Sequence, residues 1–138
     1  MKVVIDTNVL LVSLPNKSKY KPIFDAVINS DILLVVTTSV YFEYLEILNN
    51  QAKKGIAEFF IDFFRAAENI ISPEVFYNWN LVTADPDDNK FTDAYIAANA
   101  DYLVTNDAHF NEVRKVNFPP VNIVSADEFL ENLKQLSK

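Results

Sequence analysis

Carboxylate side chains crowd one stretch of this 138-residue chain. The segment "DPDDNKFTDAYIAANADYLVTND" (85–107) has five aspartates between Asp85 and Asp101 and closes on a sixth, Asp107. Like charges a few ångströms apart repel and raise each other's pKa, so a globular chain usually keeps them separated. The clustering of aspartates suggests a bound cation. Whether further acids belong to the cluster depends on the helices and strands that position them.

Strand-like and helix-like segments alternate along the chain. Short apolar runs typical of buried strands are "KVVI" (2–5), "ILLVVT" (32–37), "YLVT" (102–105) and "VNIV" (121–124). Helical patterns cover 21–30, 39–54, 56–68, 89–100 and 126–136, with Thr38 or Ser39 as the expected cap of the second and Gly55 at its end. This alternation predicts one domain over 1–138 with a three-layer α/β/α fold and a mainly parallel central sheet.

Four of the acids are expected at one edge of that sheet. In open parallel sheets, ligands bind beyond the carboxyl ends of the strands. Asp6 directly follows the first strand, Asp107 follows "YLVT", and Glu43 lies early in the helix after the second strand. Asp93 lies in the helix before "YLVT", whose N-terminal half should reach the same edge.

An oxygen-only ligand set suits Mg²⁺ or Mn²⁺. The chain has no cysteine and one histidine, so a cysteine zinc site, a disulfide and a thiol nucleophile are excluded. The net charge of −7 argues at first against a nucleic-acid partner. Two bound divalent ions would bring it to about −3 and put positive charge where a phosphate would sit.

Ordinary structural roles explain several of these residues taken singly. Asp87 and Asp88 fit an N-cap of the 89–100 helix, and Glu43 and Glu46 fit a solvated helix face. The only histidine, His109, fits a surface or capping position. The loop 16–21, "NKSKYK", could touch a phosphate backbone or simply be solvated.

Composition predicts a soluble, folded chain. Half of the residues are hydrophobic, including 11 Phe and 6 Tyr, and the Phe pairs within 56–64 fit a core or a dimer face. The start "MKVVID" has no signal-peptide pattern, and the apolar runs are far shorter than a membrane span. The single glycine excludes glycine-rich phosphate loops, and the lack of cysteine suits the cytoplasm.

The chain resembles a PIN domain, in the VapC-like branch of bacterial toxin–antitoxin toxins. The resemblance is carried by "VIDTNVL" (4–10), "EYLEIL" (43–48) and the 85–107 block, in that order. It implies Asp6, Glu43, Asp93 and Asp107 as catalytic metal ligands, with Glu46 as a substitute for Glu43 and Asp88 as a further ligand or a helix cap. Thr7, Asn8 and Thr105 would be supporting residues, and Asn106 stands where many relatives have glycine.

The resemblance implies a Mg²⁺- or Mn²⁺-dependent endoribonuclease that hydrolyses RNA phosphodiesters, with a small DNA-binding antitoxin and a second copy of the chain as partners. Two alternatives stay open. One is an aspartyl-phosphate phosphatase with Asp6 as nucleophile, although position 8 is Asn where that chemistry usually has a second Asp. The other is a degenerate PIN scaffold that only binds RNA or protein.

Overall fold

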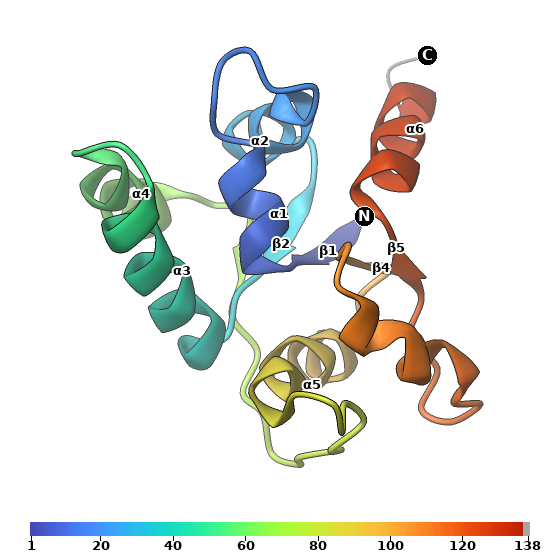
Figure 1. The fold of residues 1–138 in the computed structure, drawn as a ribbon. Helices are drawn as coiled ribbons and strands as arrows, with labels where there is room; N and C mark the ends of the chain where they lie inside the picture. Colours follow the sequence, from blue (N-terminus) through green and yellow to red (C-terminus); the bar gives the residue numbers. More distant parts are fainter. Residues whose placement is uncertain (137–138) are drawn as a thin grey trace.

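A parallel sheet forms the centre of the molecule (Figure 1). The computed structural model describes residues 1–136. The strands are β1 (Lys2–Ile5), β2 (Leu33–Val35), β3 (Ile70–Ile71), β4 (Tyr102–Val104) and β5 (Ile123–Val124). They lie in the order β3-β2-β1-β4-β5, and every neighbouring pair is parallel.

Helices cover both faces of the sheet, which confirms the three-layer α/β/α prediction. They are α1 (Thr7–Val12), α2 (Lys21–Ile28), α3 (Thr38–Gln51), α4 (Ile56–Ala66), α5 (Asn89–Ala98) and α6 (Ala126–Leu136), with 3₁₀ segments η1 (Pro86–Asp88) and η2 (Ala108–Lys115). In Figure 1, α1 and α2 lie above the sheet and α5 below it. Within residues 1–136, no helix is both long enough and apolar enough for a bilayer crossing.

The central strands are buried on both faces, as their continuous apolar sequences require. Val3, Val4 and Ile5 of β1 have no exposed surface, and neither do Leu103 and Val104 of β4. The register pairs Val3 with Leu34 on one side and with Tyr102 on the other. Because β1 lies in the middle, its carboxyl end is surrounded by the ends of β2 and β4.

One local prediction was wrong, and two short elements were missed. The cap of α3 is Thr37, whose hydroxyl accepts a hydrogen bond from the Val40 amide, and not Thr38 or Ser39, which are the first residues of the helix. Helix α1, which begins with Thr7 and Asn8, and the two-residue strand β3 both fall outside the helical and strand ranges expected from the sequence.

Gly55 separates α3 from α4. The last helical residue of α3 is Gln51, and Gly55 lies directly before Ile56 with a φ of +93°. Glycine reaches this left-handed conformation without the steric cost that a side chain brings. The only glycine of the chain thus lets α4 fold back beside α3 (Figure 1).

Candidate active site

The sheet order changes direction between β1 and β4, which is where ligands bind in folds of this kind. From β1 the chain proceeds to β2 and β3 on one side, then returns to place β4 and β5 on the other. Asp6 follows β1 and Asp107 follows β4 by three residues. The amide of Asp6 donates to the Val104 carbonyl over 2.9 Å, so the two strand ends are held together where these acids emerge.

Thr105 connects Asp6 with Asp107. Its hydroxyl donates to Asp6 Oδ2 over 2.7 Å and accepts from the Asp107 amide over 3.0 Å. Burial raises the pKa of Asp6, which is only 5% exposed, and the charges of Asp107 and Glu43 raise it further, against the lowering effect of hydrogen bonds from Thr105 and the Asn8 amide. The Asp6 carboxylate is therefore fixed in position and close to two others.

Glu43 is held by two partners on different elements. It lies on α3, where Thr7 of α1 donates a hydrogen bond to Oε2 and Lys90 of α5 contacts Oε1 over 2.9 Å. The Lys90 ammonium also lies 3.1 Å from Asp87. Glu46, the substitute, is exposed one turn further along α3. The geometry therefore favours Glu43 over Glu46 as the acid of this helix.

Asp88 joins the same group of acids. It occupies the N-cap position of α5, but its side chain makes no capping hydrogen bond. Burial raises its pKa to about 6, helped by the charges of Asp85, Asp107 and Asp6 and opposed by a hydrogen bond with His109. Asp88 therefore lies among the acids at the strand ends, and its carboxylate oxygens do not cap the helix.

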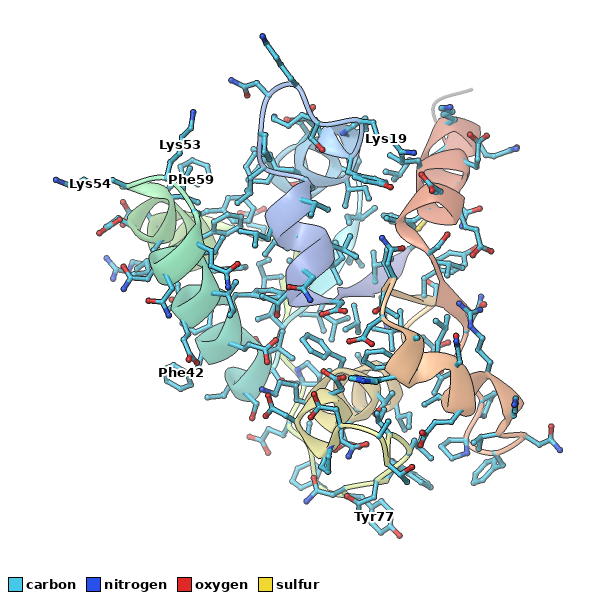
Figure 2. All side chains as sticks on the ribbon, viewed as in Figure 1. Lys19, Phe42, Lys53, Lys54, Phe59 and Tyr77 are labelled. Atoms are coloured by element: carbon cyan, nitrogen blue, oxygen red, sulfur yellow. The ribbon has the colours of Figure 1, made fainter. Side chains whose placement is uncertain are left out.

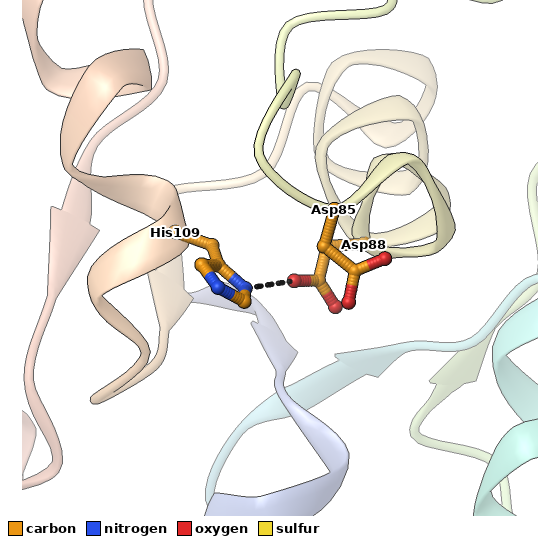
Figure 3. Close-up of side chains that lie close together, drawn as sticks. All are labelled: Asp85, Asp88 and His109. Atoms are coloured by element: carbon orange, nitrogen blue, oxygen red, sulfur yellow. Dashed lines mark hydrogen bonds and ion pairs between the residues drawn. The ribbon is translucent and has the colours of Figure 1, made fainter.

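His109 completes a cluster at this edge. Its Nδ1 lies 3.4 Å from Asp88 Oδ2 and 3.3 Å from Asp107 Oδ1. One potential ligand atom each from Asp85, Asp88 and His109 lies within 4.8 Å of the others, and Figure 3 shows the histidine facing both carboxylates. Neither Asp85 nor His109 was predicted as a site residue; in sequence, Asp85 resembles a turn residue, and it does accept from the Asp87 amide.

Asp93 lies apart from these acids. Its Oδ1 accepts from the Trp79 amide over 3.1 Å, and burial raises its pKa. Within residues 1–136, no hydrogen bond, ion pair or charge interaction connects it with Asp6, Glu43, Asp88 or Asp107. It lines a neighbouring hollow together with Lys90 and Thr37. The fold thus brings together three of the four acids expected from spacing, and adds Asp88.

The two Asn residues of the site motifs have different roles. Asn8 borders a small hollow of about 210 Å³ together with Asp6, Asn106 and Asp107. The Asn106 side chain accepts from the Ala126 amide at the start of α6 over 2.9 Å. Asn106 is not among the described residues with a positive φ. Substituting Asn for glycine in this turn therefore needs no left-handed backbone.

The donor set fits a hard divalent cation. Asp6, Glu43, Asp88 and Asp107 offer carboxylate oxygens, and His109 offers one nitrogen. Mg²⁺ and Mn²⁺ prefer such oxygen-rich sites, and Mn²⁺ also accepts an imidazole. Burial is the largest cause of the raised pKa of Asp6 and of Asp88, and neighbouring acids add to it. A bound cation would favour the charged form of both carboxylates.

The family model for the PIN domain matches residues 2–109, more than three quarters of the chain. The chain belongs to the PIN-domain family. The match begins with β1 and ends at His109, so it contains all the acids described above. No curated protein is similar enough in sequence to count as a match.

Among solved structures, this PIN domain is similar in fold to the crystal structure of VapBC2 from Rickettsia felis bound to a DNA fragment from its promoter. The TM-score is 0.57 at 20% sequence identity, and the alignment covers 91% of this chain and 98% of the other. The likeness therefore extends over nearly the whole of both chains and shows a shared fold.

Proposed function

We propose that this PIN domain is a Mg²⁺- or Mn²⁺-dependent endoribonuclease that hydrolyses RNA phosphodiester bonds. The observation that carries the proposal is the meeting of Asp6, Asp107, Glu43 and Asp88 at the carboxyl ends of β1 and β4. Membership of the PIN-domain family supports it, because PIN domains are typically nucleases.

Asp6, Glu43, Asp88 and Asp107 would hold the metal, with Asp93 as the further acid that the sequence motif suggests. A divalent ion held there supplies positive charge to the phosphodiester and lowers the pKa of a water molecule that can attack phosphorus. Thr105 keeps Asp6 and Asp107 in a fixed relation, and Thr7 orients Glu43. Mutation of residues that orient metal ligands in this way commonly weakens metal binding.

The charge of the site favours a metal-dependent route. Cysteine is absent, so no thiol can act as a nucleophile, and the one histidine is in contact with Asp88 and Asp107. The acids of the cluster repel a phosphate unless their charge is neutralised, so the proposal requires metal for both substrate binding and hydrolysis.

The chemistry of the RNA ends tests this proposal. Attack by water should leave 5′-phosphate and 3′-hydroxyl ends, whereas attack by the ribose 2′-hydroxyl leaves a 2′,3′-cyclic phosphate. The test is to cleave a labelled single-stranded RNA with the purified protein in Mn²⁺ buffer and to identify both ends by mass spectrometry. Cyclic phosphate products would contradict the proposed hydrolysis.

We further propose that the protein acts in the cytoplasm as the toxin of a toxin–antitoxin pair, with a small DNA-binding protein as its antitoxin. The similar Rickettsia felis structure is a VapBC2 assembly on promoter DNA, which supports this role. Expression of the chain should arrest bacterial growth, and expression of Asp107→Asn should not. If both the parent protein and Asp107→Asn arrest growth, the toxicity does not depend on the nuclease site.

Homodimerisation is a separate proposal. Phe59 of α4 is 44% exposed and points away from the ribbon in Figure 2. Phe24, Phe60 and Phe63 pack ring against ring with Phe59. Burying Phe59 in a dimer would remove its exposed surface from water. Light scattering that shows only a 15.7 kDa particle at micromolar concentration would contradict it.

A further inference from the structure

A second group of exposed aromatic rings lies outside the helices and strands. Phe76 is 89% exposed, Phe118 is 77% exposed and Tyr77 is 64% exposed. Figure 2 shows Tyr77 at the lower edge of the molecule, pointing into solvent. Large exposed rings on an irregular segment are unusual, because burial of an aromatic side chain is strongly favourable.

Two of these rings and the half-buried Trp79 form one surface, which we call the aromatic platform: Tyr77, Trp79 and Phe118. Tyr77 and Trp79 meet edge to face with ring centroids 4.7 Å apart, and Trp79 and Phe118 meet in the same way at 6.1 Å. Phe118 is 39 positions from Trp79 in sequence, so the fold brings two separate loops together to build the platform.

The loop that carries Tyr77 and Trp79 is fixed, although it has no helix or strand. The Trp79 amide donates to Asp93, and the Val82 amide and carbonyl both bond to the Asn89 side chain, over 2.8 and 3.0 Å. The Thr83 amide and hydroxyl bond to Glu112 of η2. The loop is therefore held in place while Tyr77 and Phe118 stay exposed, as a preformed binding surface requires.

A hollow lies between the platform's loop and the helices α3 and α5. It has a volume of about 860 Å³ and is bordered by Phe76 and Asn78 on the loop, by Lys90 and Asp93 on α5, and by Thr38 on α3. Lys90 also contacts Glu43, one of the proposed metal ligands. A strand of RNA with its phosphodiester at the acids could therefore extend along this hollow toward the rings.

We propose that the aromatic platform binds the bases of single-stranded RNA by stacking, next to the phosphodiester that is cut. This inference rests on the proposed ribonuclease function, whose substrate it narrows to unpaired RNA. Aromatic side chains bind single strands because every base has a π-face, whereas the bases of a duplex are stacked on each other. Stacking also needs no positive charge, which suits a chain with a net charge of −7.

The surroundings of the platform favour RNA over a protein as the occupant. Asn78 and Asn80 alternate with the rings and offer amide groups for base edges, and Lys115 is exposed three residues before Phe118. Lys90 places a second cation in the hollow. Val75 is the only aliphatic residue of the 75–80 segment, so polar side chains border the rings there.

Trp79 is the only tryptophan of the chain, so its fluorescence reports on the platform alone. The experiment adds a single-stranded RNA of about 12 nucleotides to Asp107→Asn protein in Mg²⁺ buffer, a background chosen to prevent cleavage. Stacking should quench Trp79 fluorescence, and a duplex of the same sequence should not. Binding seen by fluorescence anisotropy of labelled RNA without any quenching of Trp79 would overturn the proposal.

Two platform variants and a matched control complete the test. In the same background, Phe118→Ala and Tyr77→Ala should each weaken binding at least about fivefold, the lower end expected for loss of one stacked base. Phe42→Ala removes an equally exposed ring from α3 and should leave RNA affinity unchanged. Equal weakening by all three would overturn the platform, and so would a platform variant that changes only self-association in light scattering.

Failure of this inference can be told apart from failure of the proposed function. If the parent protein cleaves RNA but Trp79 is not quenched, the platform is wrong and the nuclease stands. If Trp79 is quenched by single strands but the parent protein cleaves nothing, the chain binds RNA without cutting it.

Discussion

At the scale of single residues, Asp88 and Asp93 show what spacing can and cannot predict. Both precede β4 on the same segment, and the motif pattern favoured Asp93. The structure gives Asp88 charge interactions with Asp6 and Asp107, whereas Asp93 bonds the Trp79 amide. The side of the helix that each residue faces explains the difference, because residues five positions apart point to different sides. The sequence alone did not show which side faces the strand ends.

This placement gives a paired prediction. Asp88→Asn removes a charge from the group of acids and should weaken Mn²⁺ binding by about tenfold or more. Asp93→Asn retains an acceptor for the Trp79 amide and should change Mn²⁺ affinity much less. Isothermal titration of both variants measures the difference. If Asp93→Asn loses Mn²⁺ and Asp88→Asn keeps it, the ligand set favoured by the motif is right and the one favoured by the geometry is wrong.

At the scale of elements, long and strongly patterned segments were predictable. The helices α2, α4 and α6 and the strands β1 and β4 lie where apolar periodicity put them, within a few residues. The shortest elements were missed. Strand β3 has two residues, and α1 has six that follow β1 after Asp6, so neither is long enough to show a period.

Asn69 shows how tertiary contacts define such a short element. Its side-chain amide donates to the carbonyls of Val27 and Ile32, which ties the start of β3 to the connection between α2 and β2. Nothing in the sequence around Asn69 indicates partners about 40 positions away. Its burial, at 4% exposed, is visible only in the fold.

Asn69→Ala should therefore destabilise the protein without touching the acids. The carbonyls of Val27 and Ile32 each lose a hydrogen bond, and Val27 keeps one from the Ser30 amide over 3.4 Å. A buried group left unsatisfied costs about 1–3 kcal/mol. We expect a loss of about 2 kcal/mol or more in the free energy of unfolding, measured by urea denaturation. Asn49→Ala, on the exposed face of α3, is the control and should change stability little. If Asn69→Ala leaves the free energy of unfolding unchanged, these hydrogen bonds do not hold the start of β3.

At the scale of the whole molecule, the net charge of −7 and the group of acids have one consequence for stability. Burial raises the pKa of Asp88 to about 6, and that of Asp6 is raised as well. The folded state therefore binds more protons than the unfolded chain between the ordinary pKa of aspartate, about 4, and about 6. Stability from these groups is present at low pH and is lost as pH rises through the folded pKa values.

Metal-free protein should accordingly gain stability as the pH is lowered from 7 toward 5, by about 1 kcal/mol from Asp88. Asp88→Asn should lose most of that gain, and Asp62→Asn, exposed on α4, should retain it. Thermal unfolding in EDTA at several pH values measures the effect. Adding Mn²⁺ at pH 7 should also raise the melting temperature, because the ion binds only the folded arrangement. Identical pH profiles for parent and Asp88→Asn would contradict this account of the acids.

The central claim, that the acids at the ends of β1 and β4 form a metal-dependent ribonuclease site, is tested most directly by the rate of RNA cleavage. Strand β4 provides a matched pair: Asp107 follows its carboxyl end, and Asp101 precedes its other end, where it accepts from the Lys2 amide. In Mn²⁺ buffer, Asp107→Asn should lower the rate by roughly two orders of magnitude or more, Asp101→Asn should leave it near that of the parent, and EDTA should abolish it. Cleavage that persists in EDTA, or equal rates for the two variants, would contradict the claim.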